Sequence, residues 1–121
     1  MIGIGVDVVD IDRFRRSLQR TPSMRTRLFT EGELADLADR VDQVPGLAAR
    51  FAAREAVMKS LGLGLGAFGF HDVWVERAES GAPSLAVTGP ALRLAQDAGV
   101  TRWHLSLTHS DLVAVAYVIA E

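Results

Sequence analysis

The sequence of 121 residues contains no cysteine and only one lysine, Lys59. Without cysteine there are no disulfides, thiolate metal ligands or thiol nucleophiles, so a reactive side chain must be a carboxylate, histidine, lysine or hydroxyl. No apolar run approaches the roughly 20 residues of a membrane-spanning helix, and no basic segment precedes an apolar one at the N-terminus. These absences predict a soluble, cytoplasmic protein that does not bind membranes.

Positive charge is concentrated in one segment. Between Arg13 and Thr30 there are six arginines and no acidic residue, although the net charge of the chain is −2. A basic segment on an otherwise acidic protein favours an acidic partner; the alternative is a solvated helix face without a partner. Nucleic acid is not expected, because the remaining surface repels phosphates and only two tryptophans and one tyrosine could stack on bases.

Periodicity predicts one α+β domain over residues 1–121, with a mainly antiparallel sheet wrapped by helices. The N-terminal strand alternates between two sides, one formed by Ile2, Ile4, Val6 and Val8 and the other by Gly3, Gly5 and Asp7. Helices are expected over Ile11 to Arg20 after the N-cap Asp10, from the capping box of Thr30 and Glu33 to about Arg40, over Leu47 to Leu61, and between Pro90 and Gly99. The segments HDVWVERA and PSLAVTG form one expected hairpin, and RWHLSLTH and LVAVAYVIA form another.

The last strand, Leu112 to Ala120, is apolar on both faces. In so small a chain, helices can cover one face, and a second subunit is then expected on the other.

The helix over Leu47 to Leu61 carries the first candidate groups. Glu55 and Lys59 lie one turn apart beside a stripe of alanines, which is typical either of a surface ion pair or of the acid and base of a site. Arg54 falls among the apolar positions of the same helix, so it must either extend its charge to solvent or have an anionic partner.

A second carboxylate, Asp7, lies mid-strand beside glycines that leave room for a bulky neighbour, unless it is simply an exposed strand residue. Two acids from different elements suit Mg²⁺, which keeps several waters and binds phosphate oxygens of a substrate. Lys59 could then neutralise a phosphate oxygen that the ion does not reach.

Two weaker signals follow. The glycines after the helix either bring backbone amides to a phosphate or only end the helix: Gly62, Gly64 and Gly66. His109, at the tip of the last hairpin, is an accessible base or phosphate ligand.

Three segments resemble, in order and spacing, the signatures of the holo-[acyl-carrier-protein] synthase family, the short trimeric 4′-phosphopantetheinyl transferases: GIGVDVVDIDRF, RFAAREAVMKSLGLGLG and WHLSLTHSDLVAVAYVIAE. Arg54 stands where that family usually has a lysine. The resemblance implies the 4′-phosphopantetheinyl transferase fold and Mg²⁺-dependent transfer of 4′-phosphopantetheine from coenzyme A to a serine of an apo acyl carrier protein. It further implies release of 3′,5′-ADP, use in fatty acid or polyketide biosynthesis, and a homotrimer with active sites between subunits.

The resemblance also implies residue roles. Asp7 and Glu55 would hold Mg²⁺, Lys59 would stabilise charge on the diphosphate, and Arg50 with His109 and the three glycines would bind coenzyme A. Glu55, His109 or a metal-bound water would deprotonate the serine. The helix residues expected to orient the carrier are Arg13, Arg16 and Arg20.

Two other functions use the same residues. A Mg²⁺-dependent hydrolase of coenzyme A or of a nucleotide diphosphate would need the two acids and the lysine. A trimeric nucleotide- or carrier-binding module without catalysis would not need the acids to share an ion.

Overall fold

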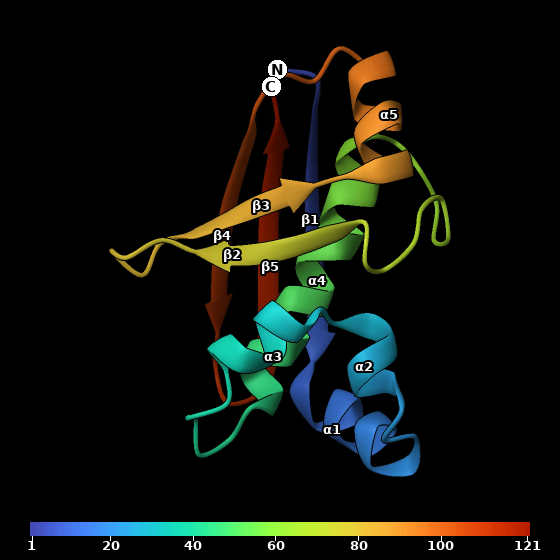
Figure 1. Cartoon of the computed structure of the whole chain (residues 1–121). Helices are drawn as coiled ribbons and strands as arrows, with labels where there is room; N and C mark the ends of the chain where they lie inside the picture. Colours follow the sequence, from blue (N-terminus) through green and yellow to red (C-terminus); the bar gives the residue numbers. More distant parts are fainter.

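A computed structural model describes all 121 residues as five helices and five strands (Figure 1). In chain order the elements are β1 (Gly3–Asp10), α1 (Ile11–Arg20), α2 (Met24–Leu28), α3 (Glu31–Asp36), α4 (Val44–Ser60), β2 (Val73–Arg77), β3 (Pro83–Val87), α5 (Gly89–Asp97), β4 (Trp103–His109) and β5 (Val113–Ala120). No helix is long and apolar enough to cross a bilayer.

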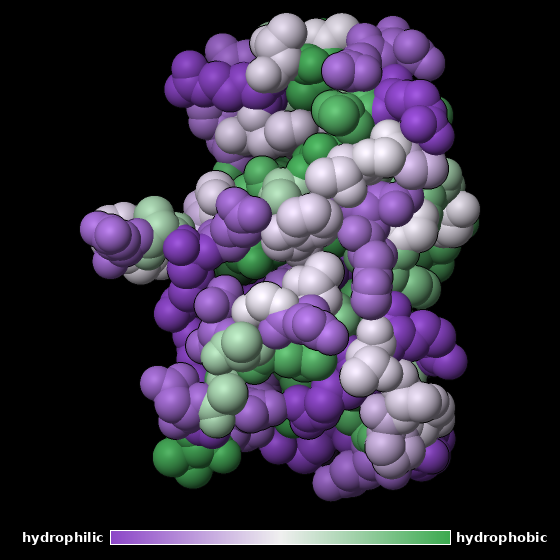
Figure 2. All heavy atoms as spheres, in the orientation of Figure 1, coloured by the Kyte–Doolittle hydropathy of each residue, from purple (hydrophilic) through white to green (hydrophobic).

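The strands form two antiparallel sheets, so the predicted α+β class is confirmed. The larger sheet has the order β1-β5-β4. Ala116 of the central strand β5 pairs with Asp7 of β1 and with Leu107 of β4. The smaller sheet is the β2-β3 hairpin. This hairpin crosses in front of the larger sheet, and its tip projects from the side of the molecule (Figures 1 and 2).

Helix α4 packs along β1 and β5 at very short range, because β1 has glycines where the two backbones meet. A Cβ atom on Gly5 would lie 1.8 Å from the carbonyl oxygen of Ala56, and one on Gly3 would lie 1.8 Å from that of Ser60. The bulky neighbour expected beside these glycines is therefore α4 itself. The alanine stripe of α4 is fully buried there, which places Asp7 of β1 beside the last turns of α4.

Local capping signals set several boundaries as predicted. The Asp10 side chain accepts a hydrogen bond from the Arg13 amide at the start of α1, and Thr30 and Glu33 form a capping box at the start of α3. Two predicted boundaries were wrong: α3 ends at Asp36 rather than near Arg40, and α4 begins at Val44, with Pro45 in its first turn, rather than at Leu47. The five-residue helix α2 was not predicted.

The outer face of the larger sheet is uncovered within one chain. It is apolar over β1 and β5, whereas β4 adds His104, Ser106 and Thr108 to it. Ile4, Val6 and Val8 of β1 are exposed, and so is Tyr117 of β5, which pairs with Val6. The opposite side of β5 is buried under α4, because its alanines and Val118 lie in the core. The expectation that β5 is apolar on both faces is confirmed.

Candidate active site

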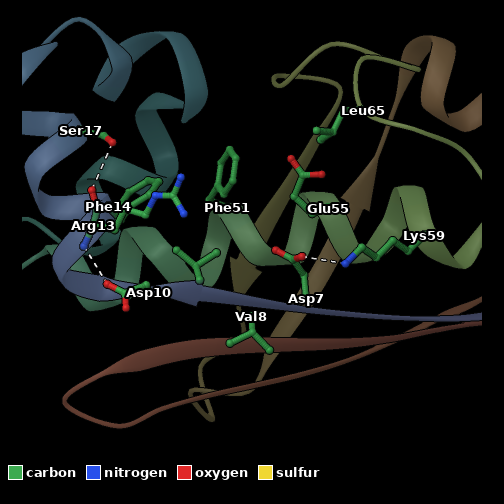
Figure 3. Close-up of a pocket in the computed structure, with 11 residues that line it drawn as sticks. Asp7, Val8, Asp10, Arg13, Phe14, Ser17, Phe51, Glu55, Lys59 and Leu65 are labelled. Carbon is green, nitrogen blue, oxygen red and sulfur yellow. Dashed lines mark hydrogen bonds and ion pairs between the residues drawn. The ribbon is translucent and has the colours of Figure 1, made fainter.

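Asp7, Glu55 and Lys59 line one pocket of about 540 Å³ between β1, α1 and α4 (Figure 3). The apolar part of the wall is formed by Phe14 of α1, Phe51 of α4 and other side chains. Arg13 lies at the α1 end of the pocket, and Leu65 reaches it from the loop after α4. Four of the predicted site residues, Asp7, Arg13, Glu55 and Lys59, therefore meet, although Asp7 and Glu55 are 48 positions apart in the sequence.

Lys59 pairs with Asp7 rather than with Glu55. Its ammonium donates to Asp7 Oδ1 at 2.9 Å and to the carbonyl oxygen of Val6 at 3.2 Å. The ordinary surface pair between Glu55 and Lys59, one of the two readings of the sequence, is not formed. Lys59 is half exposed, whereas the Asp7 side chain is only 15% exposed, so the ammonium lies at the mouth of the pocket.

Glu55 is buried and makes no hydrogen bond through its carboxylate. Burial raises the pKa of Glu55, and the neighbouring charge of Asp7 raises it further, while Lys59 opposes the shift. One ammonium thus lies near two carboxylates but pairs only with Asp7, which leaves an excess negative charge in a partly desolvated site. A divalent cation would balance this charge, and two carboxylates are enough for Mg²⁺ that keeps several waters. No cluster of three or more potential metal ligands exists, so an ion held by Asp7 and Glu55 would take its remaining ligands from water or substrate.

A second, smaller pocket of about 160 Å³ brings four basic residues together at the other end of α4: Arg40, Arg50, Arg77 and His109. Arg50 is only 3% exposed. Of its guanidinium nitrogens, only Nη1 has a hydrogen-bond partner, the carbonyl oxygen of Gly46 at 3.3 Å. Its Nε and Nη2 have none. Burial lowers the pKa of Arg50. The neighbouring charges of Arg77 and Arg40 lower this pKa further, whereas the charge of Glu33 opposes the shift. An anion would satisfy this pocket.

Sequence reasoning missed Arg40 and Arg77. Arg77 alternates onto the same side of β2 as the buried Val73 and Val75 but is itself exposed at the end of the strand, so the strand pattern does not mark it as a site residue. Nothing in the sequence pointed to Arg40.

The remaining predicted site residues are placed as follows. His109 lies in the second pocket, so one chain does not bring it to Glu55 and Lys59. The glycines flank Leu65 but do not themselves line the first pocket. Nothing would contact a Cβ at any of the three, and two of them have positive φ angles that favour glycine, 71° at Gly62 and 82° at Gly66. Arg16 and Arg20 are exposed on α1 beyond the first pocket.

Residues 3–119 match the sequence model of the 4′-phosphopantetheinyl transferase superfamily. The chain belongs to this superfamily. A holo-[acyl-carrier-protein] synthase of Streptomyces avermitilis is 49% identical to this superfamily member over 122 residues, covering 100% of the chain and 98% of the relative.

Solved structures of the superfamily share the fold. A holo-[acyl-carrier-protein] synthase from Neisseria meningitidis is 29% identical with a TM-score of 0.89, covering 100% of this chain and 98% of the other. A synthase from Bacillus anthracis in complex with coenzyme A (3′,5′-ADP) is 30% identical with a TM-score of 0.80, covering 98% and 95%. The predicted family and fold are confirmed.

Proposed function

We propose that this protein transfers 4′-phosphopantetheine from coenzyme A to a serine hydroxyl of an apo acyl carrier protein, with Mg²⁺, and releases 3′,5′-ADP. The observation that carries the proposal is the meeting of Asp7, Glu55 and Lys59 in one pocket of a chain from this superfamily. We further propose that the modified carrier serves fatty acid or polyketide biosynthesis and that the protein acts in the cytoplasm.

The geometry supports the following proposed roles. Asp7 and Glu55 would hold Mg²⁺, which when bound neutralises the diphosphate of coenzyme A. Lys59, at the mouth of the pocket, would contact a diphosphate oxygen and stabilise the charge that grows as the bond to 3′,5′-ADP breaks. The serine oxygen forms the new bond to phosphorus. Its proton would pass through a water oriented by the two carboxylates to Glu55, whose pKa is raised by burial and whose carboxylate has no other hydrogen-bond partner in the chain.

The second pocket supports a site for the nucleotide end of coenzyme A. Outside the diphosphate, the only anionic group of coenzyme A is its 3′-phosphate, and Arg50 with His109 would bind it. Since this pocket and the Asp7 pocket are separate in one chain, we propose that one active site combines two subunits of a homotrimer. The uncovered apolar sheet face supplies the surface for that assembly.

Substituting Val6→Lys is expected to prevent the trimer and transfer together. Val6 lies at the centre of the exposed apolar face, opposite Tyr117, so a lysine there would be solvated in one chain but buried between subunits. Light scattering coupled to size exclusion gives the mass. Val41→Lys is the matched control, because Val41 is fully exposed in a loop away from this face. A trimeric Val6→Lys variant would show that the sheet face is not the interface.

The basic segment fits an acidic carrier. The guanidinium groups of Arg13 and Arg20 have no acidic partner, and that of Arg16 makes only a long 3.5 Å contact with Asp12. These arginines of α1 extend from the edge of the first pocket along the exposed helix, so an acidic carrier docked there would present its serine to the pocket.

Arg20→Glu is expected to slow carrier modification severalfold, and more at low salt than at high salt, because screening shortens to ~10 Å at 0.1 M. Steady-state rates at two ionic strengths test this. Arg93→Glu makes the same charge change on α5, at the opposite end of the molecule (Figure 1), and should leave the rate unchanged. An equal loss at both salt concentrations would argue against steering.

The function itself is tested by mass spectrometry of an apo carrier incubated with the protein, coenzyme A and Mg²⁺. The expected result is a carrier heavier by one phosphopantetheine, with 3′,5′-ADP released in equal amount. Release of 3′,5′-ADP without a modified carrier would show a hydrolase, and no turnover would show a binding module.

A further inference from the structure

Arg54 is buried, and its charge is neutralised by Glu33, which is also buried. The sequence left open whether Arg54 extends to solvent or has an anionic partner, and the second alternative is correct. The pair is bidentate: Nη1 donates to Glu33 Oε2 at 2.9 Å and Nη2 donates to Oε1. Neither residue lines the pocket that holds Asp7 and Glu55.

Glu33 has no free acceptor left. Besides the guanidinium of Arg54, its Oε1 accepts from the Thr30 amide at 3.0 Å and its Oε2 accepts from the Val75 amide at 3.1 Å. A carboxylate offers about four acceptor positions, and all of them are occupied here.

Arg54 is itself held in this orientation. Its Nε donates to the carbonyl oxygen of Phe70 at 2.7 Å, its Nη1 also reaches the carbonyl oxygen of Arg50 at 3.3 Å, and its guanidinium lies 5.3 Å from the centre of the Phe29 ring. Phe29 follows the last residue of α2, Arg50 lies in α4, and Phe70 lies in the loop before β2. The guanidinium cannot turn away from Glu33 without losing these contacts.

Arg50 lies one helical turn before Arg54 and is as deeply buried, yet two of its nitrogens have no partner. Two buried arginines on one helix thus stand near one buried carboxylate, and only Arg54 is paired with it. Arg54 Nη1 contacts both Glu33 Oε2 and the carbonyl oxygen of Arg50, so the carboxylate lies beside the helical turn that carries Arg50. In agreement with this position, the Glu33 charge counters the lowering of the Arg50 pKa. Were Glu33 not saturated, it would be the natural partner for Arg50.

We propose that Arg54 is a positioning residue: by occupying the acceptors of Glu33, it keeps the buried guanidinium of Arg50 free to bind an anionic group of the substrate. This inference rests on the proposed function, in which Arg50 binds the nucleotide end of coenzyme A. It predicts that Arg54 controls discrimination between ligands with and without the 3′-phosphate, although Arg54 touches neither.

The test is the ratio of dissociation constants for dephospho-coenzyme A and coenzyme A, measured by calorimetry without carrier. The unsubstituted protein should bind coenzyme A about ten- to a hundredfold more tightly. In Arg54→Met, Glu33 is released and competes for Arg50, so the ratio should approach unity. In the double variant Arg54→Met with Glu33→Gln, the competing charge is gone and the ratio should return. A loss of folded protein lowers binding capacity for both ligands equally, so a merely structural role would leave the ratio unchanged.

Arg54→Lys provides the variant that keeps a positive charge beside Glu33 if Arg54→Met does not fold. An ammonium cannot reproduce the bidentate contact, so one acceptor opens and the ratio should fall part of the way. An unchanged ratio in every folded single variant overturns the inference. If the unsubstituted protein does not distinguish the two ligands, it is the proposed role of Arg50 that fails, and with it the basis of the inference.

Discussion

Replacing Glu55 by glutamine is expected to lower the rate of carrier modification by at least about a hundredfold while the protein stays folded. Glutamine keeps the volume of the buried side chain and removes one of the two negative charges that would hold Mg²⁺. The measurement is the rate of carrier mass change over a range of Mg²⁺ concentrations. Glu79→Gln, an exposed substitution in the hairpin loop, is the control with the same chemical change. Unchanged turnover in Glu55→Gln would place the metal elsewhere.

The same variant should also change how the free energy of unfolding depends on pH. Because burial and Asp7 raise the pKa of Glu55 above its ordinary value of 4.5, the folded protein holds this proton at pH values where the unfolded chain has released it. In metal-free protein, the free energy of unfolding should therefore decrease as pH rises from about 4.5 through the raised pKa. Urea denaturation at a series of pH values should show that Glu55→Gln lacks this decrease. A site damaged by misfolding would instead lose stability at every pH.

Local sequence signals predicted the elements around the site, because each depends on neighbouring residues. The N-cap Asp10, the capping box of Thr30 and Glu33, and the alternation of β1 all act within a few residues. The short helix α2 has no comparable signal, since five residues are too few for a period. Helix α4 begins three residues before the predicted Leu47, because proline fits the first turn of a helix and Pro45 does not prevent the helix from starting at Val44.

The contacts that make the site are long-range, and spacing alone could not choose among them. Lys59 had a plausible partner one turn away in Glu55, but the glycines of β1 let α4 approach so closely that Asp7 became the partner. Likewise, the sequence places Arg50 and Arg54 one turn apart on one helix but does not show which of them has an anionic partner. Only the position of Glu33 shows that one is neutralised and the other is not.

Replacing Arg50 by methionine is expected to weaken coenzyme A binding strongly and yet stabilise the ligand-free protein. Removing a buried charge that faces an anion costs roughly 2–5 kcal/mol of binding, which corresponds to a thirtyfold or larger rise in KM for coenzyme A. In the ligand-free protein, however, Arg50 is a buried guanidinium with two unsatisfied nitrogens, so methionine should raise the free energy of unfolding by about 1–3 kcal/mol. KM and urea denaturation are measured on the same preparation.

Dephospho-coenzyme A separates this effect from a general disturbance of α4. If Arg50 binds the 3′-phosphate, its replacement should leave KM for the dephosphorylated substrate nearly unchanged, because the contact is already missing. Glu33→Gln, which restores discrimination in Arg54→Met, should not restore it in Arg50→Met, since no guanidinium remains to be freed. Arg102→Met is a matched control, because Arg102 is an exposed arginine outside both pockets. A parallel loss for both substrates, or a destabilised ligand-free protein, would mean that Arg50 supports the fold rather than the ligand.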